Sequence, residues 1–316
     1  MGQGLKLDVC LDITRLSRST YYYRSNGKRK GKCPSKTTLY KGRRVSNQFV
    51  VNRIHKILEQ PFIDYGYKRT TYALKDQGFQ IGKSKVYRLM KEHGLLHPKI
   101  KANPIPKRGI VWYSPQPQRP FHILEIDFKY VWIEGEQRFA YLTTILDTFH
   151  RHALAWGLFP DMKTDRVQKL IHQLVDQHLI PNGVDPNKVE LNLRTDNGSQ
   201  FRSKKYLDTL KDIGVKSQYI PNATPQLNGH IEAFHNTVTR LICHKIELES
   251  LVHANQVFDL FFKTYNAKRI MKAITYKCPV QFLHLWKQGR IEIRKVKGKN
   301  KFYLRGENQA HLVSSP

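Results

Sequence analysis

Three acidic residues in this sequence stand where an acid is locally unexpected. Asp127 interrupts an aliphatic and aromatic segment, Asp196 ends a short apolar segment, and Glu232 lies beside an apolar stripe with helical periodicity. A carboxylate held near the centre of a sheet is costly unless it is paired or binds a metal. Carboxylates brought together also repel one another, and a divalent cation resolves that repulsion. We therefore predict that these three acids are metal ligands and catalytic residues.

The chemistry that such a site performs is phosphoryl transfer. Magnesium takes one or two protein carboxylates per ion and keeps water or phosphate oxygens as its other ligands. Two ions about 3.5–4 Å apart can activate a water or a 3′-hydroxyl and stabilise the leaving oxygen. The predicted cofactor is therefore Mg²⁺, with two ions per active site and Mn²⁺ as a substitute.

Each of these acids also has a simpler interpretation, which the sequence leaves open. Asp127 could pair with Lys129 at a strand edge, Asp196 could cap the Asn-Gly turn that follows it, and Glu232 could be a solvated helix acid. Asp147, at the end of a strand near a turn, competes with Asp127 for the first ligand position. We assign Asp147 a structural role.

The elements that must position these acids can be read from residue 124 onward. Residues 124–133 alternate between apolar and polar, which is strand periodicity, and they place Asp127 on a strand. The segments that follow are predicted as strands 139–146 and 152–158, helix 164–180, strand 189–195, helix 204–213 and strand 215–220. Three antiparallel strands followed by alternating helices and strands predict an α/β fold, with a mixed sheet flanked by helices.

An all-α module is predicted ahead of the sheet. Residues 47–60 read as an amphipathic helix, and two shorter helices, 69–77 and 83–93, are joined by a turn that contains Gly82. Two short helices around a tight turn form a helix-turn-helix candidate. In its second helix the apolar side chains can pack inward, which leaves four candidate DNA contacts outside: Lys83, Lys85, Arg88 and Lys91.

Basic and proline-rich segments separate and flank these parts. Residues 14–45 carry eleven basic side chains and no acid, and residues 98–120 contain six prolines, which indicates an extended linker. Lys28, Arg29 and Lys30 are candidate DNA contacts, although the same run could be a solvated basic linker. The predicted organisation is a basic arm (1–46), a helix-turn-helix domain (47–97), a linker (98–120), a catalytic core (121–285) and a basic tail (286–316).

The overall charge selects the class of partner. Lys and Arg number 54 against 25 Asp and Glu, a net charge of +29, and a polyanion such as nucleic acid offsets that self-repulsion. Ribosomal and chromatin proteins share such a charge, so charge alone does not select a function. No apolar run approaches the ~18–20 residues of a membrane span, and no cysteines are spaced as Cys-x-x-Cys. We expect a cytoplasmic, nucleoid-associated protein without a membrane partner.

The spacing of the acids is specific. Thirty-five residues separate Asp196 from Glu232, and with Asp127 this resembles the Asp, Asp, thirty-five, Glu signature of insertion-sequence transposases and retroviral integrases. The chain also resembles OrfB-type transposases in order along about 270 residues. The motifs that carry this resemblance are Leu16-Ser-Arg-Ser-Thr-Tyr-Tyr, Tyr65-Gly-Tyr-Lys-Arg, Val86-Tyr-Arg-Leu-Met-Lys-Glu-His-Gly-Leu, Leu146-Asp-Thr-Phe-His-Arg, Thr195-Asp-Asn-Gly-Ser-Gln-Phe, Thr224-Pro-Gln-Leu-Asn-Gly-His-Ile-Glu and Tyr265-Asn-Ala-Lys-Arg.

This resemblance implies an RNase H-like core, Mg²⁺ or Mn²⁺, and the cutting and joining of DNA ends. The expected partners are the element's terminal repeats, target DNA, further copies of the chain on DNA, and an upstream-frame protein. Two positions depart from the family pattern. His150-Arg151 replaces the usual Ser-Arg, and Thr239 stands where a Lys or Arg is usual, with Arg240 next. His235, Asn236 and Arg240 are further candidate DNA contacts.

Two other functions remain open at this point. An RNase H-like nuclease would cut DNA without joining it, and a non-catalytic DNA-binding regulator would do neither. The helix-turn-helix and the basic segments argue against the nuclease, and the intact set of acids argues against the regulator.

Overall fold

Two short helices form the described part of the first of two structural units, which spans Met1–Thr37. The computed structural model describes residues 6–23, 34–98, 116–221, 225–296 and 298–306. Helices α1 (Leu7–Thr14) and α2 (Arg18–Tyr21) are linked by an ion pair between Asp8 and Arg18. Both side chains are about two-thirds exposed, so this pair contributes little to stability.

The second unit, Thr38–Pro316, begins with the helical module. Helices α3 (Asn47–Leu58), α4 (Tyr67–Asp76) and α5 (Lys83–Glu92) confirm the three predicted helices within two to three residues. In α5, Val86, Leu89 and Met90 are buried as predicted. Three short strands, β1 (Thr37–Tyr40), β2 (Arg43–Ser46) and β3 (Phe79–Gln80), were not predicted. Strand β1 pairs with β3 in antiparallel fashion, with Leu39 opposite Gln80 and Tyr40 opposite Phe79.

A five-stranded mixed sheet follows. Its strands are β4 (Ile123–Ile133), β5 (Arg138–Asp147), β6 (Ala153–Phe159), β7 (Asn192–Thr195) and β8 (Lys216–Tyr219). They lie in the order β6-β5-β4-β7-β8, with β4, β5 and β6 antiparallel and β7 and β8 parallel to β4. This order, with the helices between its later strands, is the RNase H-like α/β fold, and it confirms the predicted fold class.

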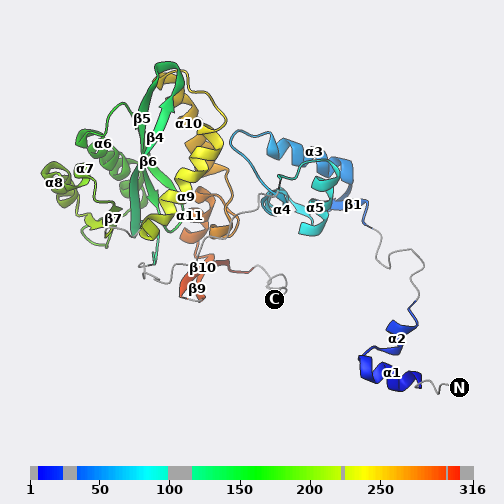
Figure 1. The fold of residues 1–316 in the computed structure, drawn as a ribbon. Helices are drawn as coiled ribbons and strands as arrows, with labels where there is room; N and C mark the ends of the chain where they lie inside the picture. The colour runs from blue at the N-terminus through cyan, green and yellow to red at the C-terminus, as the bar shows by residue number, and fades with distance from the viewer. Residues whose placement is uncertain (1–5, 24–33, 99–115, 222–224, 297, 307–316) are drawn as a thin grey trace. The chain divides into compact units, whose positions relative to one another are not determined.

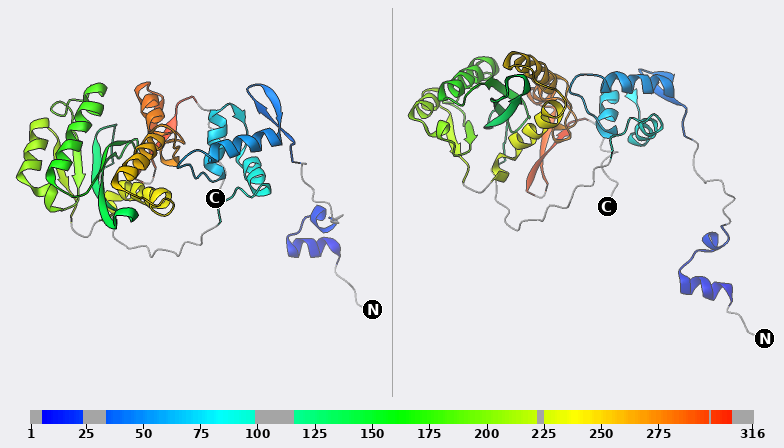
Figure 2. Two further views of the ribbon diagram at one scale, coloured as in Figure 1. Left: turned by 90° about the horizontal axis from the view of Figure 1, so that it is seen from above. Right: turned by 45° about the horizontal axis from the view of Figure 1, so that its top comes forward.

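Helices cover both faces of the sheet (Figures 1 and 2). Side chains at even positions of β4, such as Leu124 and Ile126, pack with α6 (Thr164–Leu174) and α8 (Lys204–Ile213). Those at odd positions, such as Val131 and Ile133, pack with α9 (Gly229–Val238) and α10 (Leu251–Ala267). Because side chains alternate across a strand, Asp127 lies on the α9 face.

Several elements differ from the prediction. The predicted helix 164–180 is α6 followed by a π-helical turn, Val175–Leu179, and a 3₁₀ turn, Ile180–Asn182. Helix α10 and the short α7 (Ser199–Arg202) were not predicted. Within the described part of the chain, no helix is both long enough and apolar enough to cross a membrane.

The predicted basic tail is largely folded. After α11 (Pro279–Lys287), strands β9 (Ile291–Val296) and β10 (Lys299–Leu304) form an antiparallel hairpin. Ile291 and Phe302 join a small core with Phe149 and Phe282. The basic side chains of Arg294, Lys295, Lys299 and Lys301 are exposed. These two strands were missed because their many basic residues mask the alternation of apolar side chains, which pack against the catalytic domain.

Candidate active site

Asp127 and Asp196 follow the paired residues of two neighbouring parallel strands, β4 and β7. The register pairs Ile123 with Asn192 and ends with Glu125 opposite Arg194. Each aspartate stands two residues beyond that last pair, and side chains two residues apart on a strand share a face. Two of the three predicted acids thus come from adjacent strands of the sheet.

Glu232 approaches them from the first turn of α9. Ile231 and Phe234 anchor this helix in the core that also contains Val131 of β4. Burial, followed by the like charge of Asp127, raises the pKa of Glu232, while His235 lowers it. The side chains of Glu232 and Asp196 are exposed, and that of Asp127 is 24% exposed. The site is therefore open to a large substrate such as DNA.

Backbone hydrogen bonds orient the carboxylates of the two aspartates. Oδ1 of Asp127 accepts the backbone N–H of Phe128 at 2.8 Å, and its Oδ2 lies 3.5 Å from Nδ1 of His235. Oδ1 of Asp196 accepts the backbone N–H of Gly198 at 3.0 Å. One oxygen of each carboxylate is thus held by the backbone.

The acids fit a divalent cation, although they do not form a closed cage. Among the described residues, no three His, Cys, Asp or Glu side chains are close enough together to share one ion. Magnesium needs only one or two protein carboxylates per ion, so two neighbouring aspartates suffice. The repulsion between Asp127 and Glu232 is relieved when a cation lies between them.

The sequence analysis missed a buried ion pair behind the acids. Oε1 of Glu125 lies 3.6 Å from Nη1 of Arg194, and both side chains are almost fully buried. Burial raises the pKa of Glu125 to about 7, against the opposing effects of a hydrogen bond from Ile231 and the charge of Arg194. In the sequence, Glu125 and Arg194 each stand two positions before an aspartate, within an apolar strand. This pattern could have identified the pair.

Asp147 faces the interior, away from solvent. Its carboxylate accepts the backbone N–H groups of Phe121 and Phe149 at 2.6 Å, and lies 3.1 Å from Nδ1 of His150. Burial alone would raise the pKa of Asp147, but the attraction of His150 and these hydrogen bonds lower it. His150, which stands where the family usually has Ser, is itself fully buried beside this carboxylate. This arrangement supports the structural role assigned to Asp147.

The candidate DNA contacts are distributed over several elements. On α5, Lys83 and Lys91 are exposed, while Lys85 and Arg88 are half-buried and Arg88 pairs with Glu92 at 2.9 Å. Lys28, Arg29 and Lys30 lie outside the described residues.

The three candidates on and after α9 differ in their surroundings. Asn236 is exposed, His235 is 8% exposed against Asp127, and Arg240 pairs with Asp64, which also pairs with Arg269. Arg240 lies in the π-helical turn Thr239–Cys243 that continues α9. Its guanidinium is thus engaged by an acid of the helical module.

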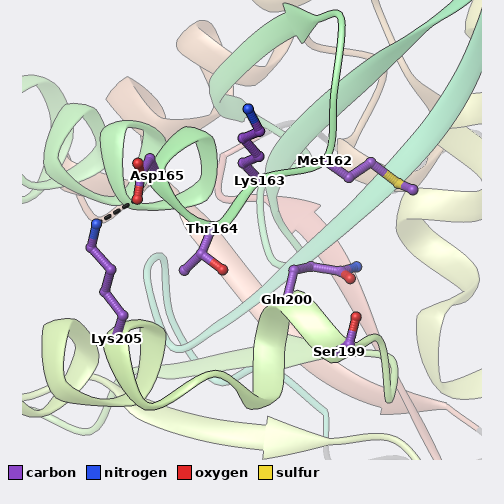
Figure 3. Close-up of a pocket in the computed structure, with 7 residues that line it drawn as sticks. All are labelled: Met162, Lys163, Thr164, Asp165, Ser199, Gln200 and Lys205. Carbon is purple, nitrogen blue, oxygen red and sulfur yellow. Dashed lines mark hydrogen bonds and ion pairs between the residues drawn. The ribbon is translucent and has the colours of Figure 1, made fainter.

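An open pocket of about 680 Å³ lies between the β6–α6 loop and the segment that follows Asp196 (Figure 3). Lys205 and Asp165 form an ion pair of 2.5 Å across one side of it. Its lining residues are Met162, Lys163, Thr164, Asp165, Ser199, Gln200 and Lys205. This mixed polar lining suits a nucleic-acid backbone better than an apolar small molecule.

Comparison with known protein families agrees with this arrangement. Residues 46–101 match the family described as HTH-like domain, residues 117–225 match the Integrase core domain, and residues 213–279 match a second family with that description. The core matches contain all three predicted acids. The HTH-like match begins one residue before the predicted domain.

Two relatives share this organisation along most of their length. The chain is 25% identical over 294 residues to transposase InsK for insertion sequence element IS150 of Escherichia coli K12, covering 89% of this chain and 95% of the relative. It is 25% identical over 248 residues to the transposase for insertion sequence element IS904 of Lactococcus lactis, covering 75% and 94%. Among solved structures, the catalytic core domain of BIV integrase aligns with a TM-score of 0.41 and 18% identity, covering 54% of this chain and 97% of that one.

Strand order and both kinds of family match agree along the chain. The chain therefore carries an HTH-like domain and an integrase core domain, and it is similar to transposases of insertion sequences.

Proposed function

We propose that this protein is a DNA transposase that binds the ends of its element and catalyses metal-dependent cleavage and strand transfer. The observation that supports the proposal most directly is that Asp127 and Asp196 come from the adjacent strands β4 and β7, with Glu232 close enough for its pKa to respond to Asp127. The integrase core that holds them is joined to an HTH-like domain, which supplies a means of binding DNA.

Asp127, Asp196 and Glu232 are proposed as the ligands of two Mg²⁺ ions, with Mn²⁺ as a substitute. When bound, such ions supply Lewis-acid stabilisation of charge at a phosphodiester and lower the pKa of the attacking hydroxyl or water. The chain's own contribution is positional. The backbone N–H groups of Phe128 and Gly198 fix the two aspartates. Helix α9 presents Glu232 close to Asp127.

DNA recognition is proposed to divide between two surfaces. Lys83, Lys85, Arg88 and Lys91 of α5 would read the element end, because base edges specify sequence while phosphate contacts only position the protein. The basic run with Lys28, Arg29 and Lys30 would bind phosphates of any sequence. Asn236 and Arg240 lie on the helical segment that carries Glu232 and are proposed as contacts near the reacting end.

The partners follow from this reaction. The proposed substrates are the two terminal repeats of the element and a target duplex, held by more than one copy of the chain. An upstream-frame protein is a further proposed partner, and the nucleoid is the proposed place of action. No described helix spans a membrane.

The test is a strand-transfer assay with purified protein, Mg²⁺, a supercoiled plasmid and an oligonucleotide that carries DNA flanking the reading frame. Oligonucleotide joined covalently to the plasmid is the expected product. Nicked plasmid without joined product would instead identify an RNase H-like nuclease. Retarded bands without cleavage, in both Mg²⁺ and Mn²⁺, would identify a non-catalytic DNA-binding regulator.

A further inference from the structure

Glu125 and Arg194 lie directly opposite each other on β4 and β7, and each stands two residues ahead of one of the two aspartates. Glu125 is 0% and Arg194 3% exposed. Charged side chains are almost never buried to this extent unless they are paired, because desolvation costs several kcal/mol per ion. The proposed reaction does not use either side chain, so their presence behind the acids needs its own explanation.

The contacts of this pair lead to the helix that carries Glu232. An oxygen of Glu125 accepts the backbone N–H of Ile231 at 2.8 Å, and Nη1 of Arg194 donates to the backbone carbonyl of Leu227 at 2.8 Å. Ile231 immediately precedes Glu232, and Leu227 lies in the 3₁₀ turn Pro225–Asn228 that leads into α9. The pair therefore contacts the chain both before and after Gly229, the first residue of α9.

The first turn of α9 depends on this outside support. The first N–H groups of a helix need an acceptor, which the residue before the helix usually provides. Within the described part of the chain, the side chain of Asn228 makes no such capping hydrogen bond. Glu125 caps the helix from β4 instead, because its carboxyl oxygen accepts the backbone N–H of Ile231 in the first turn.

Arg194 extends the connection to the edge of the sheet. Its Nε donates to Oε1 of Gln218 on β8 at 3.2 Å. One buried guanidinium thus contacts β4 through Glu125, β8 through Gln218, and the turn before α9 through Leu227. Because the guanidinium is planar and its donors are fixed in direction, it sets the relative position of these segments more tightly than a flexible amine could.

We propose that Glu125 and Arg194 are positioning residues that hold the start of α9, and with it Glu232, in register with Asp127 and Asp196. This inference rests on the proposed function, since it concerns the same three acids. A displacement of about 1 Å of a catalytic group can cost about 100-fold in rate, so loss of this support affects chemistry more than folding.

The decisive variant replaces both charges with apolar side chains of similar size, Glu125→Leu together with Arg194→Met. Such replacements of buried ion pairs are often neutral for stability, whereas single replacements leave a buried charge unpaired. The matched control is Glu190→Leu with Lys216→Met, which removes an ion pair of 3.8 Å between two largely exposed side chains beside the same strands.

Three measurements on the full-length chain separate positioning from stability: the melting temperature, amide hydrogen exchange of the peptide that contains Ile231, and Mn²⁺ binding by calorimetry. The apolar double variant is expected to melt close to wild type. Its Ile231 amide should exchange about tenfold faster, because one buried hydrogen bond is lost. Mn²⁺ affinity should fall, and strand transfer should drop by about 100-fold. The control should match wild type in all of these.

A conservative variant adds a rescue. Arg194→Lys retains the positive charge beside Glu125 but loses the fixed donors, so it should recover only part of the strand transfer that Arg194→Met loses. A folded double variant with wild-type exchange at Ile231 overturns the proposal, whatever its activity. If the double variant does not fold, the Glu125→Gln variant is the test. Unchanged amide exchange at Ile231 together with unchanged Mn²⁺ affinity in that variant overturns the proposal. Amide hydrogen exchange can be measured without enzyme turnover. If the wild-type protein joins no DNA, the proposed function is refuted, while the exchange measurement still tests the positioning role.

Discussion

Nδ1 of His235 lies 3.5 Å from Oδ2 of Asp127, across the contact between α9 and β4. The histidine is one turn beyond Glu232 and is 8% exposed, so its ring faces the acids more than the solvent. The sequence proposed His235 as a DNA contact. The structure adds a second role, in which the imidazole orients the carboxylate oxygen that the Phe128 amide leaves free.

These two roles predict different outcomes for His235→Ala. If the ring orients Asp127, cleavage should fall by about 10–100-fold while the Kd for DNA changes less than about threefold. Single-turnover cleavage and an electrophoretic binding titration measure the two effects separately. Asn236→Ala, at the exposed neighbouring position, is the comparison, because as a proposed DNA contact it should weaken binding more than cleavage. Weakened DNA binding with normal cleavage at saturating protein would assign His235 to DNA contact instead.

Replacing any one of the three acids should abolish chemistry without preventing DNA binding. Asp127→Asn, Asp196→Asn and Glu232→Gln each remove a charge while nearly preserving shape, so Mg²⁺-dependent cleavage should fall by several orders of magnitude. Binding of an end-bearing oligonucleotide should stay within a few-fold of wild type. Near-normal cleavage by Glu232→Gln would disprove its assignment as a catalytic residue.

Asp147→Asn should destabilise the protein rather than change its chemistry. The substitution replaces a buried carboxylate that accepts the backbone N–H groups of Phe121 and Phe149, and leaving a buried donor without an acceptor costs about 1–3 kcal/mol. The melting temperature should fall, and cleavage per folded molecule should stay close to wild type at low temperature. If Asp147→Asn is stably folded but inactive while Asp127→Asn is active, then Asp147 is the catalytic residue and Asp127 is not.

The protein should lose stability as the pH falls below about 6.5. Burial, followed by the nearby His150 and His178, lowers the pKa of His152 well below its ordinary value, and burial also lowers that of His178. The folded protein keeps these rings neutral, while the unfolded chain takes up protons near pH 6.5. Stability is therefore complete above that pH and declines below it, by up to ~1.4 kcal/mol per pH unit for each proton.

Thermal melts between pH 7.5 and 5 measure this decline. His152→Gln should flatten the dependence by about one proton, even if its stability at pH 7.5 is lower. The exposed His55, on α3, provides His55→Gln as the control. An unchanged pH dependence in His152→Gln would show that other groups control acid stability.

Salt and sequence should act on different parts of the DNA-binding surface. Each phosphate contact contributes roughly 0.9 to the slope of log K against log salt on duplex DNA, so the neutralised triple variant Lys28→Ala, Arg29→Ala, Lys30→Ala should give a shallower slope. That variant should weaken binding to element ends and random DNA about equally. Arg88→Ala should instead reduce the discrimination between them. The opposite pattern, with the arm controlling preference, would contradict this division.

The sequence alone determined the fold class, the helix-turn-helix helices and the three acids. Strand alternation around Asp127 and helical periodicity in α5 are local signals, because burial of one face repeats every two residues in a strand and every 3.6 in a helix. The spacing from Asp196 to Glu232 is likewise a property of the chain itself. The strand pairs of the helical module and the C-terminal hairpin were missed, since short or basic strands carry a weak alternation.

The tertiary structure alone decided which side chains support the acids. Glu125 and Ile231 are far apart in sequence, as are Arg194 and Leu227, and only the parallel register of β4 with β7 and the packing of α9 bring them together. Asp147 and Asp127 are both acids on strands, and their sequence neighbours do not reveal which faces solvent. Their roles separate because β5 ends in a buried turn at Asp147, whereas the face of β4 that carries Asp127 opens beside α9. Burial and distant hydrogen-bond partners depend on the whole chain, so no local pattern encodes them.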